Sequence, residues 1–160
     1  MSKTALVCGI SGQDGALMAN HLLSKGYTVI GVSRNAKLNS FDNLMTLNIL
    51  KDVELISSSM LEIEDVSQII SQYSPDEIYN LAGQSSVSSS YQEPLKTMIS
   101  HYQPNLNILE CLRRNFVGIR YYNACSGECY GDTGPTGADE STAFSPKSPY
   151  GVAKAAAYWH

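Results

Sequence analysis

The segment that most restricts the fold of this chain is a glycine-rich turn near its beginning. The short apolar run Thr4–Cys8 has the composition of a buried strand and leads directly into Gly9, Gly12 and Gly15. Apolar residues at helical spacing follow the third glycine. Glycines allow a tight turn and a close approach of the backbone to a pyrophosphate, and the start of a helix offers free N–H groups. The strand, turn and helix therefore predict a dinucleotide-binding site.

The end of the second expected strand, Thr28–Ser33, indicates which dinucleotide the site prefers. About twenty residues past the glycines, an acidic residue would bind the ribose 2′-hydroxyl of NAD. This chain has Ser33-Arg34 at that place. A guanidinium group can bind a 2′-phosphate, and no carboxylate is there to repel it. The pattern therefore favours NADP over NAD.

Strand-forming and helix-forming segments alternate along the rest of the chain. We expect further strands at residues 53–56, 77–81 and 120–124, helices at residues 43–50, 63–73 and from Pro149 onward, and a serine-rich loop at 85–90. A long helical region at 93–114 contains Pro104, which should kink or split it. The alternation predicts an α/β fold with a doubly wound parallel sheet of the Rossmann type, forming one domain over residues 1–160.

Composition narrows the possible partners and the compartment. The 160 residues include 15 acidic and 11 basic side chains, a net charge of -4, and no stripe of Lys or Arg, which argues against nucleic acid. No apolar run approaches the ~20 residues of a membrane span. The four cysteines show no C-x-x-C spacing and no clustered histidines, so we expect reduced thiols in a cytoplasmic protein and no metal site.

Tyr150 and Lys154 are the candidate proton-handling pair. Pro149 can occupy the first position of a helix, and the alanines that follow favour its continuation. Residues four apart lie on one face of a helix, so the phenol and the ammonium group should lie side by side. A neighbouring cation stabilises a phenolate.

Four segments together resemble the extended short-chain dehydrogenase/reductase family, and within it the GDP-mannose 4,6-dehydratase group. They are residues 9–15, 77–85, 126–131 and 146–154, and they occur in the family's order along essentially the whole chain. Five positions depart from the group: Ser59 stands where an Asp is usual, Gly83 replaces Ala, Ser86 replaces His, Gly127 replaces Ser or Asp, and Pro104 lies in a helix that the family keeps regular.

The resemblance implies a reaction and a catalytic set. Tyr150 would remove the proton of the sugar's 4-hydroxyl, and Lys154 would support the phenolate and bind the nicotinamide ribose. Ser126 would hydrogen-bond the 4-oxygen. Glu128 would take the C5 proton, which a 4-ketone acidifies, and help to expel the C6 hydroxyl. The implied reaction is the 4,6-dehydration of GDP-mannose.

The same resemblance implies which residues line the cofactor. They are Gly9, Gly12, Gln13, Asp14, Gly15, Arg34, Ser59, Leu81, Ala82, Gln84, Tyr150 and Lys154. The implied cofactor is NADP, with NAD as the less favoured alternative, and no metal is implied. The implied substrate is a GDP-sugar, with neither nucleic acid nor membrane as a partner.

Family members continue beyond position 160, so we expect an incomplete domain that lacks the C-terminal substrate domain. The helices at residues 93–114 and 150–160 form a dimer interface in this family, which implies a homo-oligomer. Two alternatives stay open. An epimerase or keto-sugar reductase would use Tyr150, Lys154 and Ser126 without Glu128, and a catalytically silent module would only bind the dinucleotide.

Overall fold

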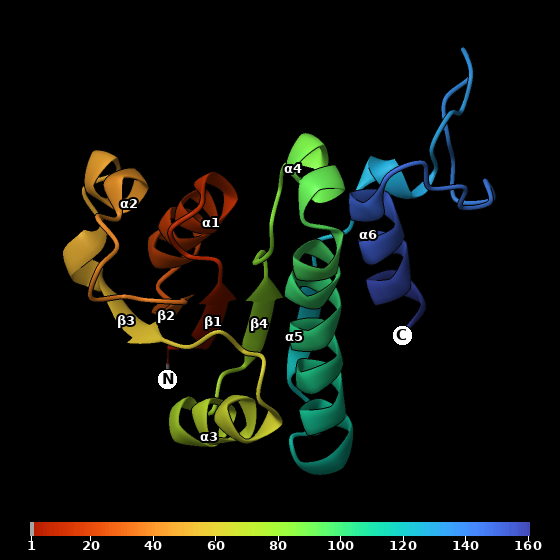
Figure 1. The fold of residues 1–160 in the computed structure, drawn as a ribbon. Coiled ribbons are helices and arrows are strands. Elements are labelled where there is room, and N and C mark those ends of the chain that lie inside the picture. The colour runs from red at the N-terminus through yellow and green to blue at the C-terminus, as the bar shows by residue number, and fades with distance from the viewer. Residues whose placement is uncertain (1) are drawn as a thin grey trace. The chain divides into compact units, whose positions relative to one another are not determined.

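All five expected strands form, and they make one parallel sheet. The strands are β1 (Thr4–Cys8), β2 (Thr28–Ser33), β3 (Val53–Ser57), β4 (Glu77–Asn80) and β5 (Arg120–Asn123). In the computed structural model, which describes residues 2–160, their order is β3-β2-β1-β4-β5. Figure 1 labels β3, β2, β1 and β4 in this order. Every neighbouring pair is parallel, so the carboxyl ends of all five strands lie at one edge.

In the described part of the chain, six α-helices and two short 3-10 turns connect and follow these strands. The α-helices are α1 (Gln13–Ser24), α2 (Asp42–Thr46), α3 (Ile63–Tyr73), α4 (Val87–Gln92), α5 (Pro94–Asn115) and α6 (Pro149–Trp159). The 3-10 turns are η1 (Leu50–Asp52) and η2 (Gly127–Cys129). Among residues 2–160, no helix combines the length and the apolar character that crossing a bilayer requires.

The sheet is covered on both faces, as the doubly wound prediction requires. Ala5 and Val7 of β1 pack in one cluster with Ala16, Ala19 and Leu22 of α1. Their neighbours in β1 point the other way, into a cluster formed with α3 and the end of α5 (Leu6, Cys8, Val66, Ile70, Ile108 and Cys111). Successive side chains of a strand face opposite sides, so a strand that is apolar throughout is buried between two helical layers.

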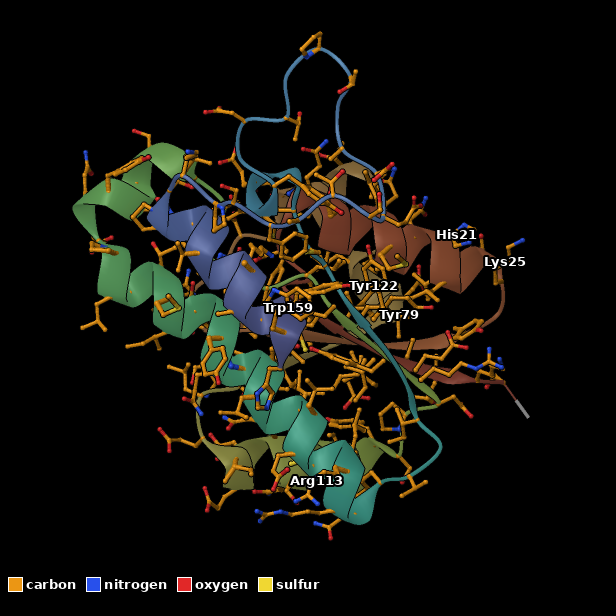
Figure 2. The ribbon with its side chains drawn as sticks, turned by 90° about the vertical axis from the view of Figure 1, so that its right-hand side faces the viewer. His21, Lys25, Tyr79, Arg113, Tyr122 and Trp159 are labelled. Atoms are coloured by element: carbon orange, nitrogen blue, oxygen red, sulfur yellow. The ribbon has the colours of Figure 1, made fainter. Side chains whose placement is uncertain are left out.

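Two tyrosines form an aromatic pair across the neighbouring strands β4 and β5. Tyr79 of β4 and Tyr122 of β5 are direct partners in the strand register, and their ring centroids are 6.2 Å apart. Figure 2 shows the two rings side by side. Cross-strand aromatic pairs contribute roughly 0.2–1 kcal/mol, so this pair helps to hold β5 at the edge of the sheet.

The chain divides into two compact units. The first comprises the residues up to Ala82 together with Asn107–Ala124, and it contains the whole sheet and the glycine-rich turn. The second comprises Gly83–Leu106 and Cys125–His160, and it contains α4, most of α5, η2 and α6. The predicted catalytic residues therefore all belong to the second unit.

Two sequence predictions between the strands were wrong. The helix expected at residues 43–50 forms but already ends at Thr46. Asn48, two residues later, adopts the left-handed conformation at φ 56°, through which an α-helix does not continue. The serine-rich segment expected as a loop contains helix α4. The side chain of Ser86 accepts a hydrogen bond from the N–H of Ser89 at 3.2 Å, and such a cap stabilises a helix start.

Of the two outcomes expected at Pro104, a kink or a split, the structure contradicts the split. The structure has a single helix α5 from Pro94 to Asn115, with Pro104 inside it. A proline removes one backbone hydrogen bond, and tertiary contacts can offset that loss. The next residue supplies such a contact, since the amide nitrogen of Asn105 donates to the carbonyl oxygen of Ala157 in α6 at 2.9 Å.

Candidate active site

The glycine-rich turn has the geometry expected for close approach to a phosphate. Gly9 lies at φ +82°, and a side chain there would start 2.8 Å from the carbonyl group of Leu81. A Cβ on Gly15 would overlap the carbonyl oxygen of Gly9. Gly12 is the N-cap of α1 and supplies no side-chain hydrogen bond to the first turn. The first-turn N–H groups of α1 therefore keep the capacity to bind an anion.

The other predicted cofactor residues of the first unit follow the carboxyl ends of its strands. Gln13 and Asp14 are exposed in the first turn of α1, and Ala82 is half-buried after β4. Arg34 is exposed directly after β2 and has no ion-pair partner among residues 2–160. Ser59 is exposed, and its hydroxyl accepts a hydrogen bond from the Leu61 N–H at 3.4 Å.

Two buried amide oxygens near the end of β4 have no hydrogen-bond partner among the described residues. They belong to Asn80, in the first unit, and to Gln84, in the second. Both side chains use their amide nitrogen, Asn80 toward Asn123 at 2.9 Å and Gln84 toward the carbonyl of Ser86 at 2.8 Å. Buried polar atoms are nearly always satisfied, so each of these oxygens is available to accept a hydrogen bond from a water molecule or a ligand. The sequence analysis included Gln84 but missed Asn80, whose signal is a polar residue ending a buried strand.

Helix α6 begins where the sequence predicted. Ser148 is its N-cap, with its hydroxyl accepting from the Gly151 N–H at 3.0 Å, and Pro149 opens the helix. Tyr150 and Lys154 lie on one face of α6, with the ammonium nitrogen 5.9 Å from the centre of the phenol ring. The structure therefore brings the predicted pair together.

The ammonium group of Lys154 lies in a largely buried environment that holds two thiols. Only 8% of Lys154 is exposed, and this burial lowers its pKa. Cys125 and Cys129 act in the opposite direction and raise the pKa of Lys154. The two sulfur atoms are 3.6 Å apart, and both cysteines are free thiols.

Ser126 is the N-cap of η2, which contains Glu128 and packs against α6. The hydroxyl of Ser126 accepts from the Glu128 N–H at 3.2 Å. The carboxylate of Glu128 accepts from the hydroxyl of Ser148 at 3.3 Å. A Cβ on Gly151 would lie 2.6 Å from the carbonyl oxygen of Glu128, so a glycine is needed where the turn meets the helix. The N-cap of α6 thus also holds the predicted acid/base.

The sequence analysis missed His101, which faces Tyr150 from α5. The two ring centroids are 5.2 Å apart in an edge-to-face arrangement, with an angle of 86° between the planes. Burial and the charge of Lys154 lower the pKa of His101 to about 4. The available signal was the spacing of Thr97, His101 and Asn105, three buried polar residues at four-residue intervals.

The second unit therefore gathers a phenol, an ammonium group and a neutral imidazole, with a carboxylate on the N-cap of the same helix. Such a set can move protons to and from oxygen and carbon atoms of a bound substrate. Within residues 2–160, no group of three or more His, Cys, Asp or Glu side chains is arranged to hold a metal ion.

Comparison with known proteins places the chain in a family. The family described as GDP-mannose 4,6 dehydratase matches residues 6–160. A "GDP-mannose 4,6-dehydratase" of Vibrio cholerae is 36% identical over 170 residues, covering 99% of this chain and 45% of that protein. "GDP-mannose 4,6 dehydratase 1" of Arabidopsis thaliana is 35% identical, covering 99% of this chain and 46% of that protein. The chain spans about half the length of the curated relatives that it matches.

Solved structures share the fold. The UDP-glucose 4-epimerase of Thermus thermophilus in complex with NAD has a TM-score of 0.84 at 26% identity, covering 98% of this chain and 49% of that one. The dTDP-glucose 4,6-dehydratase of Bacillus anthracis in complex with NAD has a TM-score of 0.82 at 20% identity, covering 99% and 49%. The fold, the motifs and the match over residues 6–160 lead to one conclusion: this chain belongs to the GDP-mannose 4,6 dehydratase family.

Proposed function

We propose that this protein acts in the 4,6-dehydration of GDP-mannose to GDP-4-keto-6-deoxymannose, with NADP as its cofactor. The observation that carries the proposal is the position of Glu128. A dehydratase needs an acid/base in addition to the Tyr and Lys pair, and here Ser148, the N-cap of the helix that carries this pair, holds the Glu128 carboxylate at 3.3 Å. Family membership supports GDP-mannose as the substrate.

The proposed roles follow from the chemistry of each side chain. Tyr150 takes the proton of the 4-hydroxyl, and Lys154 favours the phenolate that results. Ser126 uses its hydroxyl oxygen to accept from Glu128 N–H, which leaves its own O–H to donate to the sugar 4-oxygen. A ketone at C4 acidifies the C5–H bond. Glu128 then removes the C5 proton and delivers a proton to the departing C6 hydroxyl.

The glycine-rich turn and Arg34 would hold the cofactor. Bound NADP would supply the acceptor for the hydride that leaves C4 and the donor that returns this hydride to C6 after the elimination. The uncapped first turn of α1 suits its pyrophosphate, and the absence of side chains at Gly9 and Gly15 permits a close backbone approach. The exposed guanidinium of Arg34 suits a 2′-phosphate. The buried amide oxygen of Gln84 is an acceptor for an amide or hydroxyl of the ligand.

Cofactor choice can be tested by calorimetry. The wild-type chain should bind NADP more tightly than NAD, and Arg34→Ala should remove that preference by weakening NADP at least about tenfold. Lys37→Ala, an exposed lysine of the same connection, serves as the control. Equal affinity of the wild type for both dinucleotides would contradict the NADP assignment.

The reaction can be tested by incubating the protein with GDP-mannose and NADP and measuring a product that has lost one water by mass spectrometry. Glu128→Gln should lower turnover by roughly 100-fold or more while leaving NADP affinity unchanged. Glu140→Gln, which alters an exposed loop carboxylate of the same unit, is the matched control. Full activity of Glu128→Gln would reject the dehydratase mechanism.

A second candidate, a nucleotide-sugar epimerase or keto-sugar reductase, is favoured by the likeness to a UDP-glucose 4-epimerase at 26% identity. It would use Tyr150, Lys154 and Ser126 and would tolerate Glu128→Gln. Product without loss of water, formed equally by wild type and Glu128→Gln, would establish this alternative. NADP binding without any turnover would instead indicate a silent dinucleotide-binding module.

We also propose a homo-oligomer formed through α5 and α6. Large apolar side chains stand exposed on these helices within the second unit: Leu95 at 72%, Ile99 at 42%, Val152 at 43% and Trp159 at 73%. Exposed apolar groups of this kind mark association surfaces. Light scattering should give at least the dimer mass, and a monomer at micromolar concentration would contradict the proposal.

The four free thiols suit a reducing compartment, and we propose the cytoplasm.

A further inference from the structure

His101 is held in one orientation by the backbone that precedes α4. It is 5% exposed, and its Nε2 lies 2.7 Å from the carbonyl oxygen of Gln84. A carbonyl oxygen only accepts hydrogen bonds, so Nε2 carries the proton and donates it. With a pKa of about 4, the imidazole is neutral at physiological pH, and Lys154 is the cation beside Tyr150.

The space for this imidazole exists because position 83 is a glycine. A Cβ on Gly83 would overlap the Cε1 and Nδ1 atoms of His101. The glycine also has φ +135°, which side-chain-bearing residues rarely adopt. Because the His101 ring occupies the space that a side chain at position 83 would need, Gly83 and His101 form a matched pair: the second requires the first.

The imidazole is packed against the phenol that carries the proposed proton transfer. The rings of His101 and Tyr150 meet edge to face at 5.2 Å, and the ammonium nitrogen of Lys154 lies 5.9 Å from the same phenol ring. Edge-to-face contacts favour one relative orientation of two rings. Tyr150 is therefore contacted by an imidazole from α5 as well as by the ammonium group of its own helix.

We propose that His101 is a positioning residue: fixed by the Gln84 carbonyl and by the space at Gly83, its ring orients the phenol of Tyr150 for proton transfer. This inference rests on the proposed function, since it assigns His101 a part in the same reaction. It adds a determinant of the Tyr150 orientation that comes from a different helix.

Two substitutions separate the ring contact from the hydrogen bond. His101→Gln keeps an amide N–H for the Gln84 carbonyl and removes the ring, so kcat should fall roughly 2- to 12-fold with KM unchanged. His101→Phe keeps a ring and loses the donor, so its kcat should exceed that of His101→Gln although it unfolds more easily. If His101 had a purely structural role, the less stable variant, His101→Phe, would have the lower kcat, and this result would overturn the proposal. A wild-type kcat in His101→Gln would also overturn it.

A measurement without substrate distinguishes this proposal from the proposed function. In protein with ring-labelled tyrosine, the Tyr150 signal is the one missing from Tyr150→Phe. His101→Gln should shift it, because the ring current of the imidazole is lost. Tyr102→Leu removes another edge-to-face pair of this unit, that with His160 at 5.7 Å, and should leave the Tyr150 signal unchanged. An unshifted signal in His101→Gln refutes the positioning role even if the wild type shows no turnover.

Gly83→Ala provides a second route that does not depend on the folding of the His101 variants. The added methyl group should displace the imidazole and shift the Tyr150 signal as far as His101→Gln does. In the double variant Gly83→Ala/His101→Gln, the alanine should add little to the shift, although its backbone strain remains. Additive shifts from the two substitutions would show that Gly83 and His101 act separately and would contradict the matched pair.

Discussion

Acidification should destabilise the protein through His101 before its carboxylates respond. Burial, and then the charge of Lys154, lower the pKa of His101 from 6.5 to about 4, while the hydrogen bond to Gln84 opposes the shift. Between these pH values the unfolded chain binds a proton that the folded chain does not. The free energy of unfolding must therefore fall as pH decreases from about 7 toward 4, because protons favour the state that binds them.

The structure sets the size of this effect. The difference between 6.5 and about 4 corresponds to about 3 kcal/mol of stability that is present above the unfolded pKa. About 2 kcal/mol of it should be lost by pH 5. Carboxylates with lowered pKa values, such as Glu110 and Asp139, also lose their contribution in acid. Their unfolded values of 4.5 and 3.8 place most of that loss below pH 5.

Urea unfolding followed by far-ultraviolet circular dichroism, at several pH values between 5 and 7, measures the slope. The wild type should lose about 2 kcal/mol over this interval. His101→Gln should be less stable at pH 7 but nearly flat with pH. His21→Gln, which alters an exposed histidine of α1, is the control and should keep the wild-type slope. The reasoning is refuted if wild type and His101→Gln show the same slope.

Three further predictions follow from named contacts. Ser148→Ala removes the N-cap of α6 and the donor to Glu128, so the free energy of unfolding should fall by about 1 kcal/mol in denaturant titrations, and no change would show that the cap is dispensable. Gly15→Ala places a methyl group against the Gly9 carbonyl oxygen, so calorimetry should show NADP affinity reduced at least about tenfold, whereas wild-type affinity would contradict the close approach. Disulfide reagents should modify exposed Cys125 first and spare Cys8, which is fully buried with a pKa raised to about 12, and rapid labelling of Cys8 in native protein would disprove its burial.

Local patterns in the sequence determined most of the fold. The apolar run at β1, the helical spacing of α3 from Ile63 to Tyr73 and the start of α6 at Pro149 were all predicted, because each depends on residues close together in the chain. The glycine spacing at 9, 12 and 15 likewise identified the turn before α1. The motifs also indicated the family, since they combine residue type with order along the chain.

The tertiary structure alone decided what surrounds the candidate catalytic side chains. Sequence spacing placed Lys154 beside Tyr150, but a helix pattern cannot show that a ring from another helix packs on that phenol. His101 and Gly83 lie far apart along the chain, and their fit depends on a backbone conformation at φ +135°. The bond from Ser148 to Glu128 joins residues 20 positions apart. Contacts between residues that are distant along the chain form only when the chain has folded, so local propensity does not predict them.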